Sequence, residues 1–131
     1  MTAVEAVDLG ELTDFWTAVC PSDRLVPNRG ACVLVCSRQI AVFRTDDGGL
    51  YAVDNADPCC GANVISRGLV GSLGDAWIVA SPMYKQRFDL STGVCVDDAT
   101  KRLSVYDIAE VNNTVFVRVG DSKGNDYRDI A

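Results

Sequence analysis

The sequence predicts an all-β fold assembled from about ten short strands. Runs of alternating apolar and polar residues recur along the chain, and short turns rich in Gly, Asn, Asp and Pro separate them. No segment keeps the 3.6-residue apolar period of a helix over several turns. Short strands joined by tight turns are typical of antiparallel sheets stacked as a sandwich or closed as a barrel.

The first half of the chain carries the densest β-type sequence. Its expected strands span residues 15–20, 31–36, 39–44 and 50–54. Pro21–Arg24 and Ser37–Arg38 are expected to form turns between them. The segment Asp46-Asp-Gly-Gly49 is a strong hairpin signal, because glycine adopts positive φ at little steric cost. These short connections predict an antiparallel meander.

The second half alternates between turns and shorter strands. Its expected strands span residues 77–80, 86–90, 94–96, 103–108 and 115–119, with a hairpin turn at 111–114. Arg67-Gly68, Gly71 and Gly74 are expected to break up the segment before the first of these strands. Phe88 and Leu90 lie on the apolar side of an alternating run and are expected to be core anchors.

One domain accounts for most of the 131 residues. Residues 1–12 are expected to be a weakly ordered lead-in, residues 13–119 the folded domain and residues 120–131 a polar C-terminal tail. No segment approaches the ~20 apolar residues that cross a bilayer. The acidic N-terminus lacks the basic and apolar segments of a signal peptide, so a cytoplasmic protein is expected.

The composition excludes several classes of function. With a net charge of −6 and a pI near 4.4, the chain lacks the dense Lys and Arg surface that binds phosphates, so no nucleic acid and no anionic membrane is an expected partner. Histidine is absent, and there is no Walker loop and no G-x-G-x-x-G fingerprint. Independent catalysis is therefore not expected.

The six cysteines do not form a zinc or disulfide pattern, because no C-x-x-C pair occurs and no histidine is available. Cys32 and Cys36 are four residues apart, which would place both on one face of a strand as small hydrophobes. Cys59 and Cys60 lie in a predicted loop. They are expected to be loop filler, and a redox role is the alternative.

Two turn-rich loops form a matched pair at the centre of the chain. One spans Asn55–Asn63 and the other Ser81–Leu90, and each contains a small polar or acidic residue followed by proline, at Asp57-Pro58 and Ser81-Pro82. Strand-type sequence bounds both loops, so they are expected to stand as rigid fingers.

These loops resemble the cluster-binding loops of Rieske iron–sulfur domains. The pattern Cys-Pro-His-x-Gly-Ala of that family falls on residues 57–62, and its second pattern, Cys-Pro-x-His-Gly-x-x-Phe-Asp-Leu, falls on residues 81–90. The four ligand positions are replaced, and they carry Asp57, Cys59, Ser81 and Tyr84. A Rieske cluster needs two thiolates and two imidazoles. The resemblance therefore implies stacked antiparallel sheets with both fingers at one tip, and no metal.

The segments Ser81–Phe88, Gly61–Gly68 and Leu25–Gly30 resemble one subfamily in particular, the small subunits of NADH-dependent nitrite reductase, from about Asp14 to Gly120. The resemblance implies a small, non-redox subunit of an assimilatory enzyme that reduces nitrite to ammonia. It further implies docking on a large subunit that holds FAD, an iron–sulfur cluster and sirohaem, with no cofactor in this chain.

The expected contact with such a partner lies at the fingers, where apolar, aromatic and cationic groups combine. The candidate residues are Arg67, Met83, Tyr84, Lys85 and Arg87. In the alternative, Tyr84 packs across the two loops and the cations are simply solvated.

Asp57 and Ser81 are expected to cap their own turns through side-chain oxygens. Two other functions stay open at this stage. One is a Rieske-type ferredoxin-like electron carrier, and the other is a thiol switch that uses Cys59 or Cys60.

Overall fold

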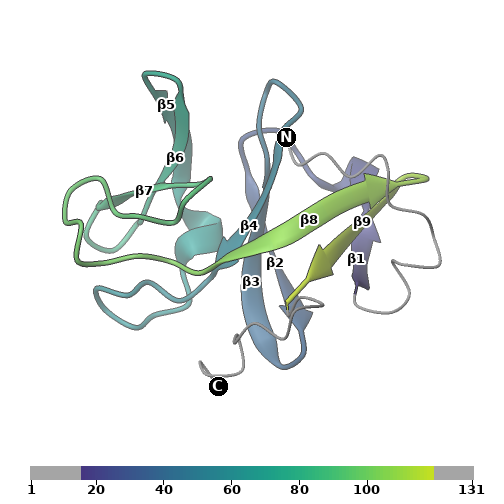
Figure 1. Cartoon of the computed structure of the whole chain (residues 1–131), viewed down its shortest axis with the longest axis horizontal. Coiled ribbons are helices and arrows are strands. Elements are labelled where there is room, and N and C mark those ends of the chain that lie inside the picture. Colours follow the sequence, from purple (N-terminus) through teal and green to yellow (C-terminus); the bar gives the residue numbers. More distant parts are fainter. Residues whose placement is uncertain (1–15, 120–131) are drawn as a thin grey trace.

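The computed structural model describes residues 16–119, and within this range nine strands form two antiparallel sheets (Figure 1). The larger sheet has the order β1-β9-β8-β4-β3-β2, with β1 (Thr17–Pro21), β2 (Gly30–Val35), β3 (Arg38–Arg44), β4 (Leu50–Asp54), β8 (Val105–Val111) and β9 (Thr114–Arg118). The smaller has the order β5-β6-β7, with β5 (Leu69–Leu73), β6 (Ala76–Ala80) and β7 (Arg87–Asp89). Helix in the described range is limited to the 3-10 turns η1 (Ser22–Arg24) and η2 (Ile65–Arg67), so the all-β prediction is confirmed.

Strand β3 is buried on both faces and divides its side chains between two hydrophobic cores. Ile40 and Val42 pack in a core with β8 and β9, whereas Ala41 and Phe43 pack in a second core with the small sheet. Successive side chains of a strand point to opposite faces, which is why one apolar run can serve both cores. Figure 1 shows the result, with the small sheet on one side of β3 and β4 and with β1, β8 and β9 on the other.

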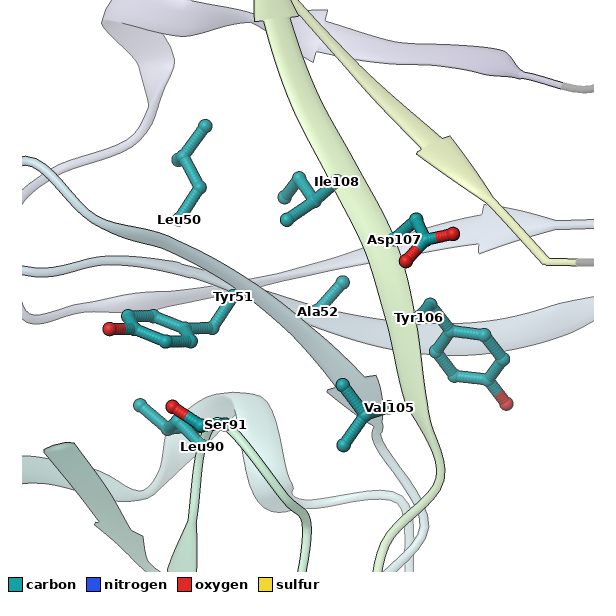
Figure 2. A pocket seen from close by; sticks show the side chains of 9 residues that line it. All are labelled: Leu50, Tyr51, Ala52, Leu90, Ser91, Val105, Tyr106, Asp107 and Ile108. Atoms are coloured by element: carbon teal, nitrogen blue, oxygen red, sulfur yellow. The ribbon is translucent and has the colours of Figure 1, made fainter. Parts of the chain in front are cut away.

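The larger sheet opens between β4 and β8. These strands pair only at Ala52 with Tyr106 and at Val53 with Val105, and β8 then continues along β9. An opening of about 320 Å³ forms where they diverge, as Figure 2 shows. Its lining residues come from β4, from β8 and from the loop after β7. The sheet therefore curves around the first core instead of staying flat.

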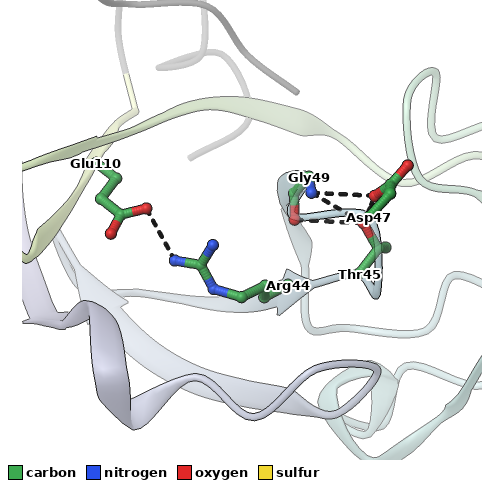
Figure 3. Close-up of polar contacts among 5 residues, drawn as sticks. All are labelled: Arg44, Thr45, Asp47, Gly49 and Glu110. Atoms are coloured by element: carbon green, nitrogen blue, oxygen red, sulfur yellow. Dashed lines mark hydrogen bonds and ion pairs between the residues drawn. The ribbon is translucent and has the colours of Figure 1, made fainter.

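The predicted hairpin between β3 and β4 is confirmed, and Figure 3 shows its turn. Asp47 accepts hydrogen bonds from the Thr45 hydroxyl and from the Gly49 N–H (3.1 Å), and the first of these lowers the pKa of Asp47 most. The Trp77 indole also donates to Asp47 Oδ2 at 3.1 Å and ties the hairpin to β6. At the end of β3, Arg44 forms an ion pair with Glu110 of β8 at 2.9 Å.

The structure corrects two details of the strand predictions in the first half. The turn between β2 and β3 consists of Cys36 and Ser37, both with positive φ (52° and 65°), so Cys36 is not in a strand. Cys32 is exposed, because the inward face of β2 carries residues 31, 33 and 35. Neither cysteine is therefore the buried hydrophobe that the four-residue spacing predicts.

In the second half, the segment between the fingers contains β5, which the glycines at 68, 71 and 74 obscure. In place of the strand predicted at 94–96, Val94 forms an isolated bridge to Arg102 and Cys95 forms one to Phe88. Phe88 and Leu90 are fully buried in the second core, as predicted.

Among residues 16–119, no helix has the length and apolar character needed to span a bilayer. The predicted lead-in (1–12) and C-terminal tail (120–131) lie outside the described residues.

Candidate functional site

Within the first finger, residues 57–62 form a loop closed by its own backbone. The Asp57 N–H donates to the Ala62 carbonyl (2.8 Å), and the Gly61 N–H donates to the Asp57 carbonyl (2.6 Å). The Asp57 Oδ1 accepts a hydrogen bond from the Cys59 N–H at 2.8 Å, so this side chain caps its own turn as predicted. Gly61 has φ +80°, a left-handed conformation that favours glycine.

Within the second finger, residues 81–86 repeat this pattern position by position. The Ser81 N–H donates to the Gln86 carbonyl (2.9 Å), and the Lys85 N–H donates to the Ser81 carbonyl (2.8 Å). The Ser81 Oγ accepts from the Met83 N–H at 3.3 Å. Lys85, which corresponds to Gly61, is also left-handed with φ +63°. The prediction that the two loops are a matched pair is confirmed.

A direct hydrogen bond joins the two fingers. The Ser81 hydroxyl donates to the Asp57 Oδ2, across 24 positions in the sequence. The Asp57 residue is fully buried, and Ser81 is 1% exposed. The sequence predicts a separate cap for each turn, and the bridge between them is an additional finding. Each of the two side chains therefore fixes its own loop and holds the other loop in place.

Asn55 anchors the base of the first finger and was missed by the sequence analysis. It is buried, and its Oδ1 accepts from the Ser66 N–H (2.7 Å). Its Nδ2 donates to the Asn63 carbonyl (3.2 Å) and to Gln39 Oε1 (3.1 Å). The available signal is an Asn directly after a strand and before a proline turn, where such side chains often bond nearby backbone groups.

The donor set between the fingers does not fit a Rieske iron–sulfur cluster. Asp57 and Ser81 bond each other, Cys59 offers a single thiol, and Tyr84 is 60% exposed. Thiolates and imidazoles are the ligands such a cluster requires. In the part of the chain that the structure describes, no group of three or more His, Cys, Asp or Glu could hold a metal ion. Hydrogen bonds between protein groups thus hold these loops in place.

Four of the predicted contact residues are exposed around the fingers. Met83 is 50% exposed and Tyr84 60%, and both Arg67 and Lys85 are exposed. The exposure of Tyr84 contradicts the alternative in which its ring packs across the two loops. These groups are accessible to a partner.

Arg87 differs from the other four. Its guanidinium is held by Asp97, with Nη2 to Oδ1 at 2.6 Å and Nε to Oδ2 at 3.2 Å. These hydrogen bonds lower the pKa of Asp97 to about 2. Arg87 is thus fixed against the loop that follows β7.

The thiol of Cys59 is not activated. Burial and the neighbouring carboxyl group of Asp57 raise the pKa of this thiol, whereas a reactive cysteine needs a lowered pKa. The geometry therefore disfavours a thiol switch at Cys59.

The opening between β4 and β8 offers no side chain suited to act as a general base. Its titratable lining groups are Tyr51, Tyr106 and Asp107. Burial raises the pKa of both tyrosines, that of Tyr106 to about 12, and Asp107 is paired with Arg118. The opening is best explained as a consequence of the strand divergence seen in Figure 2.

Two hollows lie beside Arg67, at the foot of the second finger. One has a volume of about 410 Å³ and is lined by Asn28, Arg29, Gly30, Ser66, Arg67, Gly68 and Leu69. The other has a volume of about 210 Å³ and is lined by Arg67, Leu69, Ala80, Ser81, Pro82 and Lys85. Three cations and no carboxylate line these two hollows, although the whole chain is acidic.

Comparison with known proteins identifies similar sequences and structures. Residues 15–118 match the family model described as a Rieske-like [2Fe-2S] domain. The nitrite reductase (NADH) small subunit of Salmonella typhimurium is 38% identical over 105 residues, which cover 79% of this chain and 96% of that protein. A crystal structure from Mycobacterium tuberculosis, described as an NADH-dependent nitrite reductase small subunit, has a TM-score of 0.75 and 43% identity, covering 78% of this chain and 92% of that one.

A third relative differs in its organisation. The nitrite reductase [NAD(P)H] large subunit of Klebsiella oxytoca is 39% identical to this chain over 102 residues. The match covers 78% of this chain but only 11% of that protein. In Klebsiella oxytoca, a segment similar to this chain is thus part of the large subunit polypeptide itself.

Proposed function

This chain belongs, with the nitrite reductase (NADH) small subunits, to the Rieske-like [2Fe-2S] domain family, and on that premise we propose that it is an accessory subunit that docks on the catalytic large subunit of nitrite reductase. The chain carries no redox centre in this proposal. The reduction of nitrite to ammonia with NADH takes place on the large subunit, which would hold the FAD, the sirohaem and the iron–sulfur cluster.

The observation that carries the proposal is the hydrogen bond between Ser81 and Asp57. It occupies the two positions where the family pattern has cysteine ligands, and it keeps both fingers ordered by a contact between protein side chains alone. Because the Asp57 and Ser81 side chains are buried and hydrogen-bonded to each other, they are not available to bind a metal. In this proposal the fingers provide a surface of fixed shape, which is what a docking subunit needs.

The relative from Klebsiella oxytoca supports the choice of partner. A domain that is encoded within the large subunit of one organism can act as a separate subunit in another if the two surfaces bind each other. Arg67, Met83, Tyr84 and Lys85 are proposed to lie at this contact, because all four are exposed around the fingers. Arg87 contributes less, since Asp97 already holds its guanidinium.

Six free cysteines without a disulfide in residues 16–119 support a complex located in the cytoplasm, where thiols stay reduced.

The proposal is tested by co-expressing a tagged large subunit with this chain. We expect the two to co-purify, and we expect the isolated chain to be colourless and free of iron. A chain that shows charge-transfer bands with bound iron would instead be a Rieske-type ferredoxin-like electron carrier. A colourless chain that does not co-purify with the large subunit would refute the accessory role.

A further inference from the structure

The outer face of the β5–β6 hairpin is apolar along its whole length. Val70 of β5 and Val79 of β6 pack inward in the second core, so the alternate residues of both strands face outward. These outward residues pair across the hairpin as Leu69 with Ala80, Gly71 with Ile78, and Leu73 with Ala76. A sheet face turned to solvent normally carries polar side chains, so this face is unusual.

The face is open at its edge strand. Leu69 is 78% exposed and Leu73 is 44% exposed. Ile78, in the central strand β6, is covered by its neighbours and is only 8% exposed. Between the two leucines, a side chain at Gly71 would find no atom within 4 Å. The two exposed leucines flank this glycine and form an apolar patch. Figure 1 shows the hairpin projecting from the body of the molecule, where a large partner could reach it.

This apolar patch is continuous with the second finger. Leu69 and Ala80, at one end of it, also line the 210 Å³ hollow together with Pro82. Arg67 and Lys85 line the same hollow, and Asp75 lies at the opposite end, in the β5–β6 turn. An apolar centre with a charged rim is the usual anatomy of a protein interface.

We propose that the large subunit binds across the outer face of β5–β6, and not at the fingertips alone. Its surface would insert apolar side chains over Leu69, Gly71 and Leu73 and would place carboxylates opposite Arg67 and Lys85. The inference rests on the proposed function and adds to it the sheet face and the chemistry of the partner's surface. The cationic rim of an otherwise acidic chain supplies the charge complementarity.

The test compares Leu69→Asp with Leu34→Asp, each in co-purification and in a titration against the large subunit. Leu34 is a matched control, because it is 68% exposed on β2, in the other sheet. We expect Leu69→Asp to weaken binding about tenfold to a hundredfold, the range that the loss of one buried leucine gives, and Leu34→Asp to bind as the wild type does. Arg67→Glu should weaken binding more than Arg24→Glu, an exposed control on η1.

A second variant guards against loss of folding. A Cβ atom added at Gly71 would meet no atom within 4 Å, so Gly71→Arg should be tolerated, cover the apolar patch and block docking while the urea midpoint stays unchanged. If the wild-type chain does not bind the large subunit at all, the proposed function fails. If it binds and all these variants bind equally well, only the sheet face is refuted. Concentration-dependent dimerisation of the wild type that Leu69→Asp abolishes would assign the face to a second copy and also overturn the inference.

Discussion

The hydrogen bond between the fingers allows a quantitative prediction about stability. In Asp57→Ala, the Cys59 N–H and the Ser81 hydroxyl both lose the acceptor that the fully buried Asp57 carboxyl group provides. Each such bond contributes about 1 kcal/mol net, and a buried group left without a partner adds a penalty of about 1 kcal/mol or more. We expect Asp57→Ala to lower the free energy of unfolding by about 2–3 kcal/mol. That is a large share of the ~5–15 kcal/mol typical of a domain, but it leaves the protein folded.

Ser81→Ala should have a similar effect. It removes the donor to Asp57 Oδ2 and the acceptor of the Met83 N–H, and it leaves a buried carboxyl oxygen without its partner. We again expect a loss of about 2–3 kcal/mol. Because the two single variants break the same contact, the double variant should lose less than their sum, with a coupling energy of about 1–2 kcal/mol.

Urea denaturation of the four proteins of this cycle measures the coupling directly. Asp98→Ala is a suitable control, because Asp98 accepts the same kind of turn hydrogen bond from the Thr100 N–H (3.0 Å) but does so at the surface. Its midpoint should stay close to that of the wild type. Additive effects of Asp57→Ala and Ser81→Ala would show that the bridge contributes nothing and would refute its role as the link between the fingers.

Three further predictions concern single residues. Gly61→Ala should lower the free energy of unfolding by about 1 kcal/mol, because φ at this position is +80° and an added Cβ meets no neighbour. Lys85→Gly, at the equivalent position of the second finger, should leave stability unchanged or raise it, and urea melts compare the two variants. Burial raises the pKa of Tyr106 to about 12, so the contribution of this group to stability is complete below pH 10 and is lost as the pH rises through 12. Tyr106→Phe should remove this alkaline loss of stability, which melts between pH 10 and pH 12 would measure. Iodoacetamide should modify exposed Cys36 before Cys59, whose thiol pKa is raised, and mass spectrometry of peptides would show the reverse order if that were wrong.

Much of the fold follows from local sequence because its strands are short and its turns are chemically distinct. The hairpin turns at Asp46–Gly49 and at residues 111–114 are predictable, since their turn residues tolerate positive φ, whereas the strand register comes from the structure. Strand β5 was not predicted, because Gly71 and Ser72 interrupt its apolar residues and its pairing with β6 is a tertiary property. Cys32 was placed on the wrong face for a similar reason, since a continuous apolar run does not reveal which side is inward.

In the candidate site too, contacts between near neighbours in the chain could be predicted from the sequence, and contacts between distant segments could not. Each finger could be predicted from its own proline and capping residue, because a turn cap is a contact between near neighbours in the chain. The bond from Ser81 to Asp57 could not, because it depends on how β6 and β4 are packed around the second core. The ion pair that holds Arg87 to Asp97 also forms only once the loop after β7 has folded back.

The equivalence of the two fingers explains how hydrogen bonds between protein groups can order both loops. Both loops close through the same backbone hydrogen bonds and the same left-handed residue, so each is largely fixed by itself. A cluster would then be needed only to hold one loop against the other, and the single contact between Asp57 and Ser81 performs that task at the two equivalent first positions. Replacing both by cysteine would restore the two thiolate ligands but not the two imidazoles, because Cys59 and Tyr84 stand at those positions and the sequence contains no histidine. The mismatch with a Rieske ligand set therefore extends to all four ligand positions, and the proposed role of the surface that the loops support is binding.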